Sequence, residues 1–484
     1  MTGAPGPSLL PHLRKLLSHA ALYGAADVFT NVVNFLLVPL YTAFLTPSDY
    51  GDLALLLLFS TLAKILFRMG LDSAFFRVHY DLKGESEQRV LAGTAFLFSA
   101  LVGAVLFGMV ALFSPLLGRL LLGQPGASRL VVLAAADVFL GLFAFVPLTL
   151  LRIQDRAGLF ATLAAVRHLA NTLLKIALVV KGWGVLGVLV SDVAATALLS
   201  ALVAPRLLRH AAFAPSRQLL RELLRFGLPK VPHGLLLQVQ NLADRKILDL
   251  FVSRAEVGLY QVGYTFGMGV KFPISAFEPA WQPFVYSQLK SQDAPRTLAR
   301  VATFAWAGFL FCGVALAAVS GELIVLMTPK SPAFRAAAPV IPVVVLAYLL
   351  QGGFLLTTIG IGIAKKARYY PLVTLVAAAT NVAANLLLVP RFGILGAAWA
   401  TVASYAVMAG LGFFLAQPLY PVPWEAMRLA RATALGALVY ASALLAPTAL
   451  VSALAVKAAL LAAFALGLAF LLRGDGVQGS FGRG

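Results

Sequence analysis

The amino-acid sequence predicts an all-α polytopic membrane protein with about 14 transmembrane helices. The chain has 484 residues, of which 60% are hydrophobic and only 12% charged, and its mean hydropathy is +0.89. Apolar runs recur along its whole length, each close to the ~20 residues that cross a bilayer. Only short polar stretches separate these runs. A soluble protein of this size does not have such a composition.

The expected spans follow one another from the N-terminus to the C-terminus. They cover residues 17–45, 52–76, 90–116, 130–151, 157–180, 184–205, 226–251, 257–287, 299–328, 336–363, 368–389, 393–416, 428–446 and 450–472. Residues 1–16 are basic and rich in Pro and Gly, but no A-x-A-like cleavage site follows closely. We therefore expect the first span to be a retained helix and not a removed signal peptide.

An internal repeat divides these spans into two halves. The short loop "FLTPSDYG" (44–51) matches "FVSRAEVG" (251–258), and "VVKGWGVLG" (179–187) matches "LVPRFGILG" (388–396). In both pairs the second copy lies 207–209 residues downstream, which indicates duplication. The predicted division is an N-lobe over 1–205, a cytoplasmic linker over 206–225, a C-lobe over 226–417, and two extra spans with a cytoplasmic tail over 418–484. Two six-helix lobes in the same orientation are typical of transporters that rock around a midplane site.

The linker is basic and amphipathic. In "RLLRHAAFAPSRQLLRELLR" (206–225), leucines follow one side of a helix and arginines lie nearby. This pattern fits a helix lying on an anionic inner leaflet, and it fits a solvated basic linker equally well.

The net charge of +19 follows from membrane topology and does not indicate nucleic-acid binding. With both termini in the cytoplasm, the basic loops containing "RQLLRELLR", "AKKAR" and "RLAR" all fall on the inner side. The lone cysteine, Cys312, excludes a disulfide framework within the chain. No Walker A motif and no zinc-ligand spacing occur, so neither direct ATP use nor metal catalysis is expected.

Several spans carry polar side chains at helical spacing, where residues i, i+3, i+4 and i+7 share one face. Charges inside a bilayer are costly and usually face a cavity or a partner. The basic members are the candidate substrate-binding residues, namely Lys64, Arg68, Arg167, Lys175, Arg245 and Lys271. The remaining polar members would line the same cavity or couple transport to an ion, and they are Asp27, Asn31, Asn34, Asn171, Gln238, Asn241, Asp244, Glu278, Asn381 and Asn385.

The surplus of positive charge favours an anionic substrate. Arginine in particular suits phosphate through bidentate hydrogen bonds, so such a cavity could bind a pyrophosphate that crosses the membrane. The alternative is a set of structural ion pairs, such as Asp244 with a cation of a neighbouring span, or Glu278 with Lys271.

Three motifs resemble a known family. The segment "NVAANLLLVPRFGILGAAWATVASY" (381–405) is similar to a signature of the O-antigen and exopolysaccharide flippases of the MOP superfamily. The segments "ADRKILDLFVSRAEVGLYQVGY" (243–264) and "RMGLDSAFFRVHYD" (68–81) resemble those that follow spans seven and two in the same family. The resemblance implies two six-helix lobes around a cationic cavity. It also implies that alternating access, driven by an ion or voltage gradient, moves polyprenyl-pyrophosphate-linked oligosaccharide to the outer leaflet.

Other functions remain open at this point. The two extra spans also resemble those of lipid II flippases, which serve peptidoglycan synthesis. A multidrug extruder of the same superfamily and a membrane glycan polymerase or ligase are further alternatives, although the cation surplus disfavours the former and the short outer loops disfavour the latter.

The remaining expectations follow from the resemblance. We expect a non-enzymatic monomer in the bacterial cytoplasmic membrane, with no cofactor and with coupling to an H⁺ or Na⁺ gradient. Its partners would be the lipid-linked glycan, the bilayer, and possible polymerase and glycosyltransferase neighbours.

Overall fold

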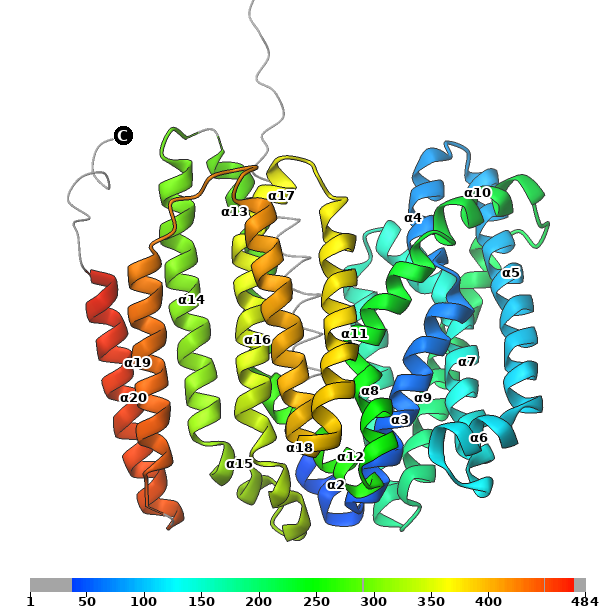
Figure 1. Ribbon diagram of the computed structural model, residues 1–484. Helices are drawn as coiled ribbons and strands as arrows, with labels where there is room; N and C mark the ends of the chain where they lie inside the picture. The colour runs from blue at the N-terminus through cyan, green and yellow to red at the C-terminus, as the bar shows by residue number, and fades with distance from the viewer. Residues whose placement is uncertain (1–36, 290, 448, 474–484) are drawn as a thin grey trace, which may run out of the picture. The chain divides into compact units, whose positions relative to one another are not determined.

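A computed structural model describes residues 37–289, 291–447 and 449–473. Over these ranges every regular element is a helix, as Figure 1 shows, so the predicted fold class is confirmed. Nine stretches of the described residues are long and apolar enough to cross a membrane, which identifies a multi-pass membrane protein. The count of about 14 spans stays a prediction.

The chain forms two units, Met1–Lys246 and Ile247–Gly484, and the boundary falls near the end of α11. The described helices of the first unit are α2 (Val38–Phe44), α3 (Pro47–Arg68), α4 (Leu71–Asp81), α5 (Glu85–Leu112), α6 (Ser114–Leu122), η1 (Pro125–Ala127), α7 (Ser128–Ile153), α8 (Ala157–Val180), α9 (Gly184–His210), α10 (Arg217–Gly227) and most of α11 (Lys230–Phe251).

The second unit continues from the end of α11. Its further helices are α12 (Arg254–Gly267), η2 (Met268–Val270), α13 (Lys271–Gln288), α14 (Ala294–Ala318), α15 (Ser320–Met327), η3 (Pro332–Ala337), α16 (Val340–Thr357), α17 (Ile359–Ile363), α18 (Tyr369–Ala416), α19 (Ala426–Leu444) and α20 (Leu450–Arg473). Several predicted spans are interrupted: residues 257–287, for example, are divided by η2.

The two copies of each repeated motif have the same local structure. Thr46 begins α3 with a capping box whose other member is Asp49, and Ser253 begins α12 with the same arrangement to Glu256. These side chains satisfy backbone N–H groups that a helix start leaves free. Gly184 and Gly393, in the second motif pair, both have φ +54, a conformation that glycine adopts at little cost. The Gly393 kink joins the two helical parts of α18.

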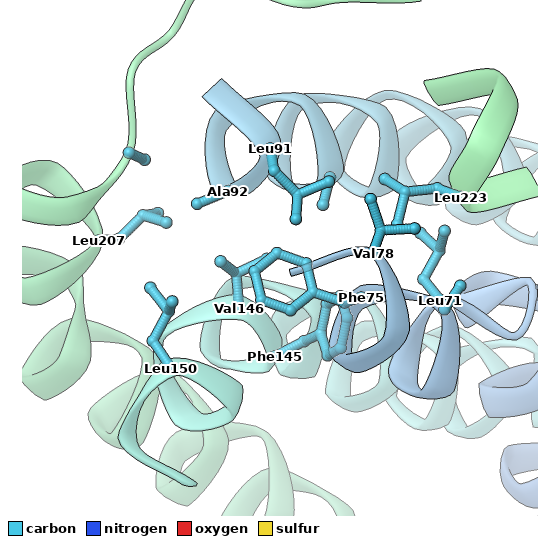
Figure 2. Packing of buried hydrophobic residues seen from close by; sticks show 13 residues of the cluster. Leu71, Phe75, Val78, Leu91, Ala92, Phe145, Val146, Leu150, Leu207 and Leu223 are labelled. Atoms are coloured by element: carbon cyan, nitrogen blue, oxygen red, sulfur yellow. The ribbon is translucent and has the colours of Figure 1, made fainter. Parts of the chain in front are cut away.

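The interior of the first unit includes a cluster in which α4, α5, α7 and α10 meet (Figure 2). Leu71, Phe75 and Leu91 are fully buried there, and Phe145 packs edge-on against Phe75. Burial of each such side chain contributes about 1.5–3 kcal/mol. Leu223 of α10 is also fully buried in this cluster.

The position of α10 shows what two leucines of the linker contact. Helix α9 continues to His210, and α10 packs its leucine side on α4 and α5, with Leu219 against the same cluster as Leu223. Leu219 and Leu223 therefore contact protein, while the arginines at 217, 221 and 225 are exposed. The sequence could not show this contact because lipid tails and protein interior are equally apolar, and the surroundings of the basic side of α10 stay a prediction.

The helices of the two extra C-terminal spans, α19 and α20, lie beside α14 (Figure 1). At one end, Arg300 of α14 contacts Glu425 at 3.2 Å, and Arg428 contacts the same carboxylate oxygen at 2.6 Å. Farther along, the Trp306 indole donates to the Thr433 hydroxyl at 3.2 Å. These polar contacts fix α19 on the second unit.

Candidate functional site

The structure places the predicted polar residues on five of its helices. Lys64 and Arg68 lie on α3, Arg167, Asn171 and Lys175 on α8, Gln238, Asn241, Asp244 and Arg245 on α11, Lys271 and Glu278 on α13, and Asn381 and Asn385 on α18. Asp27, Asn31 and Asn34 lie outside the described residues. Within each unit, contacts now show which of these side chains come together.

The polar face of α8 meets two polar residues of α9. Lys175 Nζ lies 2.8 Å from Asp192 Oδ1, and Asn171 Nδ2 donates to the same oxygen at 2.9 Å. Neither side chain of the ion pair is fully enclosed, since Lys175 is 15% and Asp192 29% exposed. The pair joins α8 to α9.

A second connection lies one turn away on both helices. Arg167 Nη2 donates to the Thr196 hydroxyl at 3.0 Å, and that hydroxyl donates to Asp137 Oδ1 on α7 through a very short hydrogen bond. The Thr196 hydroxyl therefore links a guanidinium to a carboxylate across three helices. Networks of this kind strengthen in a low dielectric and fix the direction of each member.

Lys64 lies close to this network. Its ammonium is within electrostatic range of the Arg68 and Arg167 guanidiniums and of the Asp72 and Asp137 carboxylates. Arg68 pairs with Asp72 at 2.9 Å, one turn further along. Lys64 itself is exposed and makes no hydrogen bond or ion pair in the part of the chain that the structure describes.

We refer to these residues of the first unit as the N-unit polar cluster. It consists of Lys64, Arg68, Asp72, Asp137, Arg167, Asn171, Lys175, Asp192 and Thr196. It holds four cations and three carboxylates, so one positive charge is in excess. Like charges at short range repel, and an anion beside Lys64 would relieve that repulsion. The cluster can therefore bind an anion without breaking an existing ion pair.

The Arg245 guanidinium, by contrast, already has partners within its own helix. Its side chain is 2% exposed, its Nη1 lies 2.6 Å from Asp244 Oδ1, and it donates to the Asn241 carbonyl at 2.7 Å. Asp244 thus contacts the cation of the next residue in its own helix. A ligand would have to displace the Asp244 carboxylate to reach this guanidinium.

The predicted residues of the second unit fall in two different settings. Lys271 and Glu278 are exposed and make no ion pair with each other, so this structural alternative is not present. Asn381 and Asn385 are fully buried within α18, where Asn385 Nδ2 donates to the Asn381 carbonyl at 2.8 Å and to its Oδ1 at 3.1 Å. The two asparagines therefore pack inside the protein.

Sequence reasoning missed several residues that make these contacts. Asp137, Asp192 and Thr196 each lie in a largely apolar run. The cost of a single charge in a membrane helix was a sufficient signal for Asp137 and Asp192. The same signal applies to Lys457 of α20, whose ammonium lies 2.7 Å from Glu322 Oε1.

No group of three or more His, Cys, Asp or Glu side chains that could hold a metal ion occurs among the residues with described positions.

Comparisons with known proteins agree with this arrangement. A family model described as "Polysaccharide biosynthesis protein" matches residues 41–328, which is more than half of the chain. The solved structure "Lipid II flippase MurJ, inward closed conformation" is similar with a TM-score of 0.75 and 12% identity, over 94% of this chain and 100% of that one.

An inward-facing multidrug resistance MATE family transporter of the MOP superfamily is similar with a TM-score of 0.60 and 16% identity, over 83% of this chain and 95% of that one. No curated protein sequence matches significantly. The likeness to both structures shows that this chain has the fold of MOP-superfamily transporters.

Proposed function

The chain belongs to the polysaccharide biosynthesis protein family, and on that premise we propose that it is a flippase for lipid-linked oligosaccharide. In this proposal it moves polyprenyl-pyrophosphate-linked repeat units, of the O-antigen or exopolysaccharide type, from the inner to the outer leaflet of the bacterial cytoplasmic membrane. Transport proceeds by alternating access, with both chain termini in the cytoplasm. The protein acts as a transporter and makes or breaks no glycan bond.

We infer the class of substrate from the surroundings of Lys64. It has no partner in the described ranges, while Arg68 and Arg167 lie within electrostatic range of it. A pyrophosphate offers several anionic oxygens, and guanidinium groups bind such oxygens in bidentate geometry. Lys64 contributes a point charge that is free to move onto the ligand.

The carboxylates of the cluster have a supporting role in this proposal. Asp72, Asp137 and Asp192 hold the neighbouring side chains of the cluster in position before the ligand arrives. Asp137 and Asp192 are also the groups on which coupling to an H⁺ or Na⁺ gradient would act, because neutralising either one raises the positive charge around the anion.

Lipid II is the second candidate substrate, and the likeness to the lipid II flippase MurJ over nearly the whole chain favours it. Its diphosphate would use the same cations. A multidrug extruder suits the fold as well, but a cluster with surplus positive charge disfavours cationic drugs.

Deleting the gene in cells that make the glycan tests this function. Periodate labelling of intact spheroplasts reaches only glycan on the outer leaflet. We expect the deletion to trap lipid-linked oligosaccharide inside, and the wild-type chain to restore labelling. Unchanged outer labelling in the deletion strain, with lipid II trapped inside, would assign the chain to the second candidate substrate. Unchanged outer-leaflet labelling of both lipids in the deletion strain would contradict the flippase proposal.

A further inference from the structure

Helix α13 contains two internal prolines, Pro279 and Pro283. Proline has no N–H, so each removes the donor that normally serves the carbonyl four residues earlier. The carbonyls of Ser275 and Pro279 thereby lose their usual helical partners. In this part of α13, backbone carbonyl oxygens as well as side chains can therefore accept hydrogen bonds from a ligand.

A cavity of about 380 Å³ opens at this segment, lined by Glu278, Pro279, Gln282, Pro283 and Tyr286. The polar members are spaced i, i+4 and i+8, so they follow one face of the helix. All three are exposed, and Tyr286 is 51% exposed. None of them makes a hydrogen bond or ion pair within the described part of the chain.

Helices α17 and α18 complete the surroundings of Tyr286 within the same unit. A Cβ built on Gly362 would lie 3.2 Å from the Tyr286 hydroxyl and 3.9 Å from the Tyr370 hydroxyl. The Tyr370 hydroxyl donates to the Thr358 carbonyl at 3.4 Å, which holds that ring in place. The absence of a side chain at Gly362 therefore leaves room for both tyrosine hydroxyls.

The lining determines which ligands fit. A carboxylate, an amide, a phenol and a backbone carbonyl are rich in acceptors, and only the amide and phenol also donate. The one charge is negative, which disfavours an anion. A bare cation would not fill the space, because cavities of about 300–1,000 Å³ hold organic ligands. A neutral ligand with many hydroxyl donors and apolar C–H faces suits both the acceptors and the tyrosine rings.

We propose that this α13 pocket is a saccharide subsite that binds sugar hydroxyls of the transported glycan. The inference rests on the proposed function for the identity of the ligand as a glycan. Glu278 accepts from neighbouring hydroxyls, Gln282 accepts and donates, and Tyr286 places its ring against the C–H face of a sugar. Recognition of the sugar is thereby separate from binding of the diphosphate in the N-unit polar cluster.

The test uses two soluble probes on the full chain in nanodiscs. One is the repeat-unit oligosaccharide, released from the lipid pool of the producing cells by mild acid, and the other is inorganic pyrophosphate. Saturation-transfer NMR titrations give the Kd of each probe. We expect Glu278→Ala with Gln282→Ala to raise the oligosaccharide Kd about tenfold or more and to leave the pyrophosphate Kd unchanged.

Matched variants separate the pocket from the cluster. Asp293→Asn removes an exposed carboxylate of the same unit that lies outside the pocket, and it should change neither Kd. Lys64→Ala should weaken only pyrophosphate binding. Because Glu278 and Gln282 are exposed, their replacement leaves the fold intact, and Glu278→Gln gives an independent variant that keeps the side-chain shape.

An unchanged oligosaccharide Kd in the double variant, or no binding of the oligosaccharide by the wild-type chain, would overturn the subsite. The oligosaccharide could also bind in a way that depends on Glu278 and Gln282 while the chain fails to restore outer-leaflet glycan. That result would support the subsite and contradict the flippase proposal. The two failures are therefore distinguishable.

Discussion

Lys457 and Glu322 form a doubly hydrogen-bonded ion pair between α20 and α15, with the ammonium 2.7 Å and 2.8 Å from the two carboxylate oxygens. Their side chains are 11% and 14% exposed. Both lie in apolar surroundings, where each charge alone would be costly. The pair fastens the last described helix to the second unit.

Removing one member of this pair should destabilise the protein strongly. Lys457→Met leaves Glu322 buried without its cation, at a cost of about 3 kcal/mol. Lys457→Met with Glu322→Leu should recover most of that loss, because an apolar pair needs no charge compensation. Thermal unfolding in detergent measures both. Lys271→Met, at an exposed lysine of the same unit, is the control, and an equal loss there would contradict the structural role of the pair.

Thr196 should matter to transport through its hydroxyl alone. Thr196→Val keeps the side-chain volume but disconnects Arg167 from Asp137. Each lost hydrogen bond to a charged group is worth about 1.5–3 kcal/mol, so we expect export to fall about tenfold or more. Export of labelled glycan measures this. Thr162→Val, at an exposed α8 threonine that bonds only the Gly158 carbonyl, should leave the rate unchanged.

Gly70 should tolerate no side chain. It has φ +72, and a Cβ there would overlap the Gly227 carbonyl of α10. Gly70→Ala therefore forces α10 away from α4, and we expect loss of folded protein from the membrane. Gly182→Ala is the matched control, with φ +83 and open space around the added methyl, and it should cost only about 1–2 kcal/mol. Equal detergent-extractable yield of both variants would contradict the close packing of α4 and α10.

Local features of the fold were predictable from the sequence because they depend on nearby residues. Thr46 with Asp49, and Ser253 with Glu256, are capping signals within four residues, and both cap as such a spacing predicts. The polar stripe of Arg167, Asn171 and Lys175 likewise follows from helix periodicity, and it does lie along one side of α8 against α9.

The partners of these residues were not predictable. Lys175 pairs with Asp192 only because α8 and α9 pack in one register, which no local pattern encodes. The same holds for Lys457 and Glu322, which are far apart in sequence. Arg245 shows the opposite case, because one of its partners is the carboxylate of the adjacent residue, and its place in a cavity stays a prediction.

Arg245→Ala should reduce export together with stability. The variant removes the guanidinium that contacts the buried Asp244 carboxylate, so we expect a loss of about 3 kcal/mol alongside the loss of transport. Thermal unfolding and export, measured on the same preparation, check this. Export loss at unchanged unfolding temperature would instead indicate direct contact of Arg245 with the substrate.

Lys64 is the residue on which anion binding can be measured most cleanly, because it is exposed and has no partner among the described residues. The decisive measurement is the rate at which proteoliposomes containing Lys64→Ala, Lys64→Arg or the wild-type chain move pyrophosphate-linked oligosaccharide across the bilayer. We expect Lys64→Ala to slow movement about tenfold or more at unchanged unfolding temperature, and Lys64→Arg to keep most of the rate. Equal rates for Lys64→Ala and the wild-type chain would contradict the binding of the diphosphate by the N-unit polar cluster.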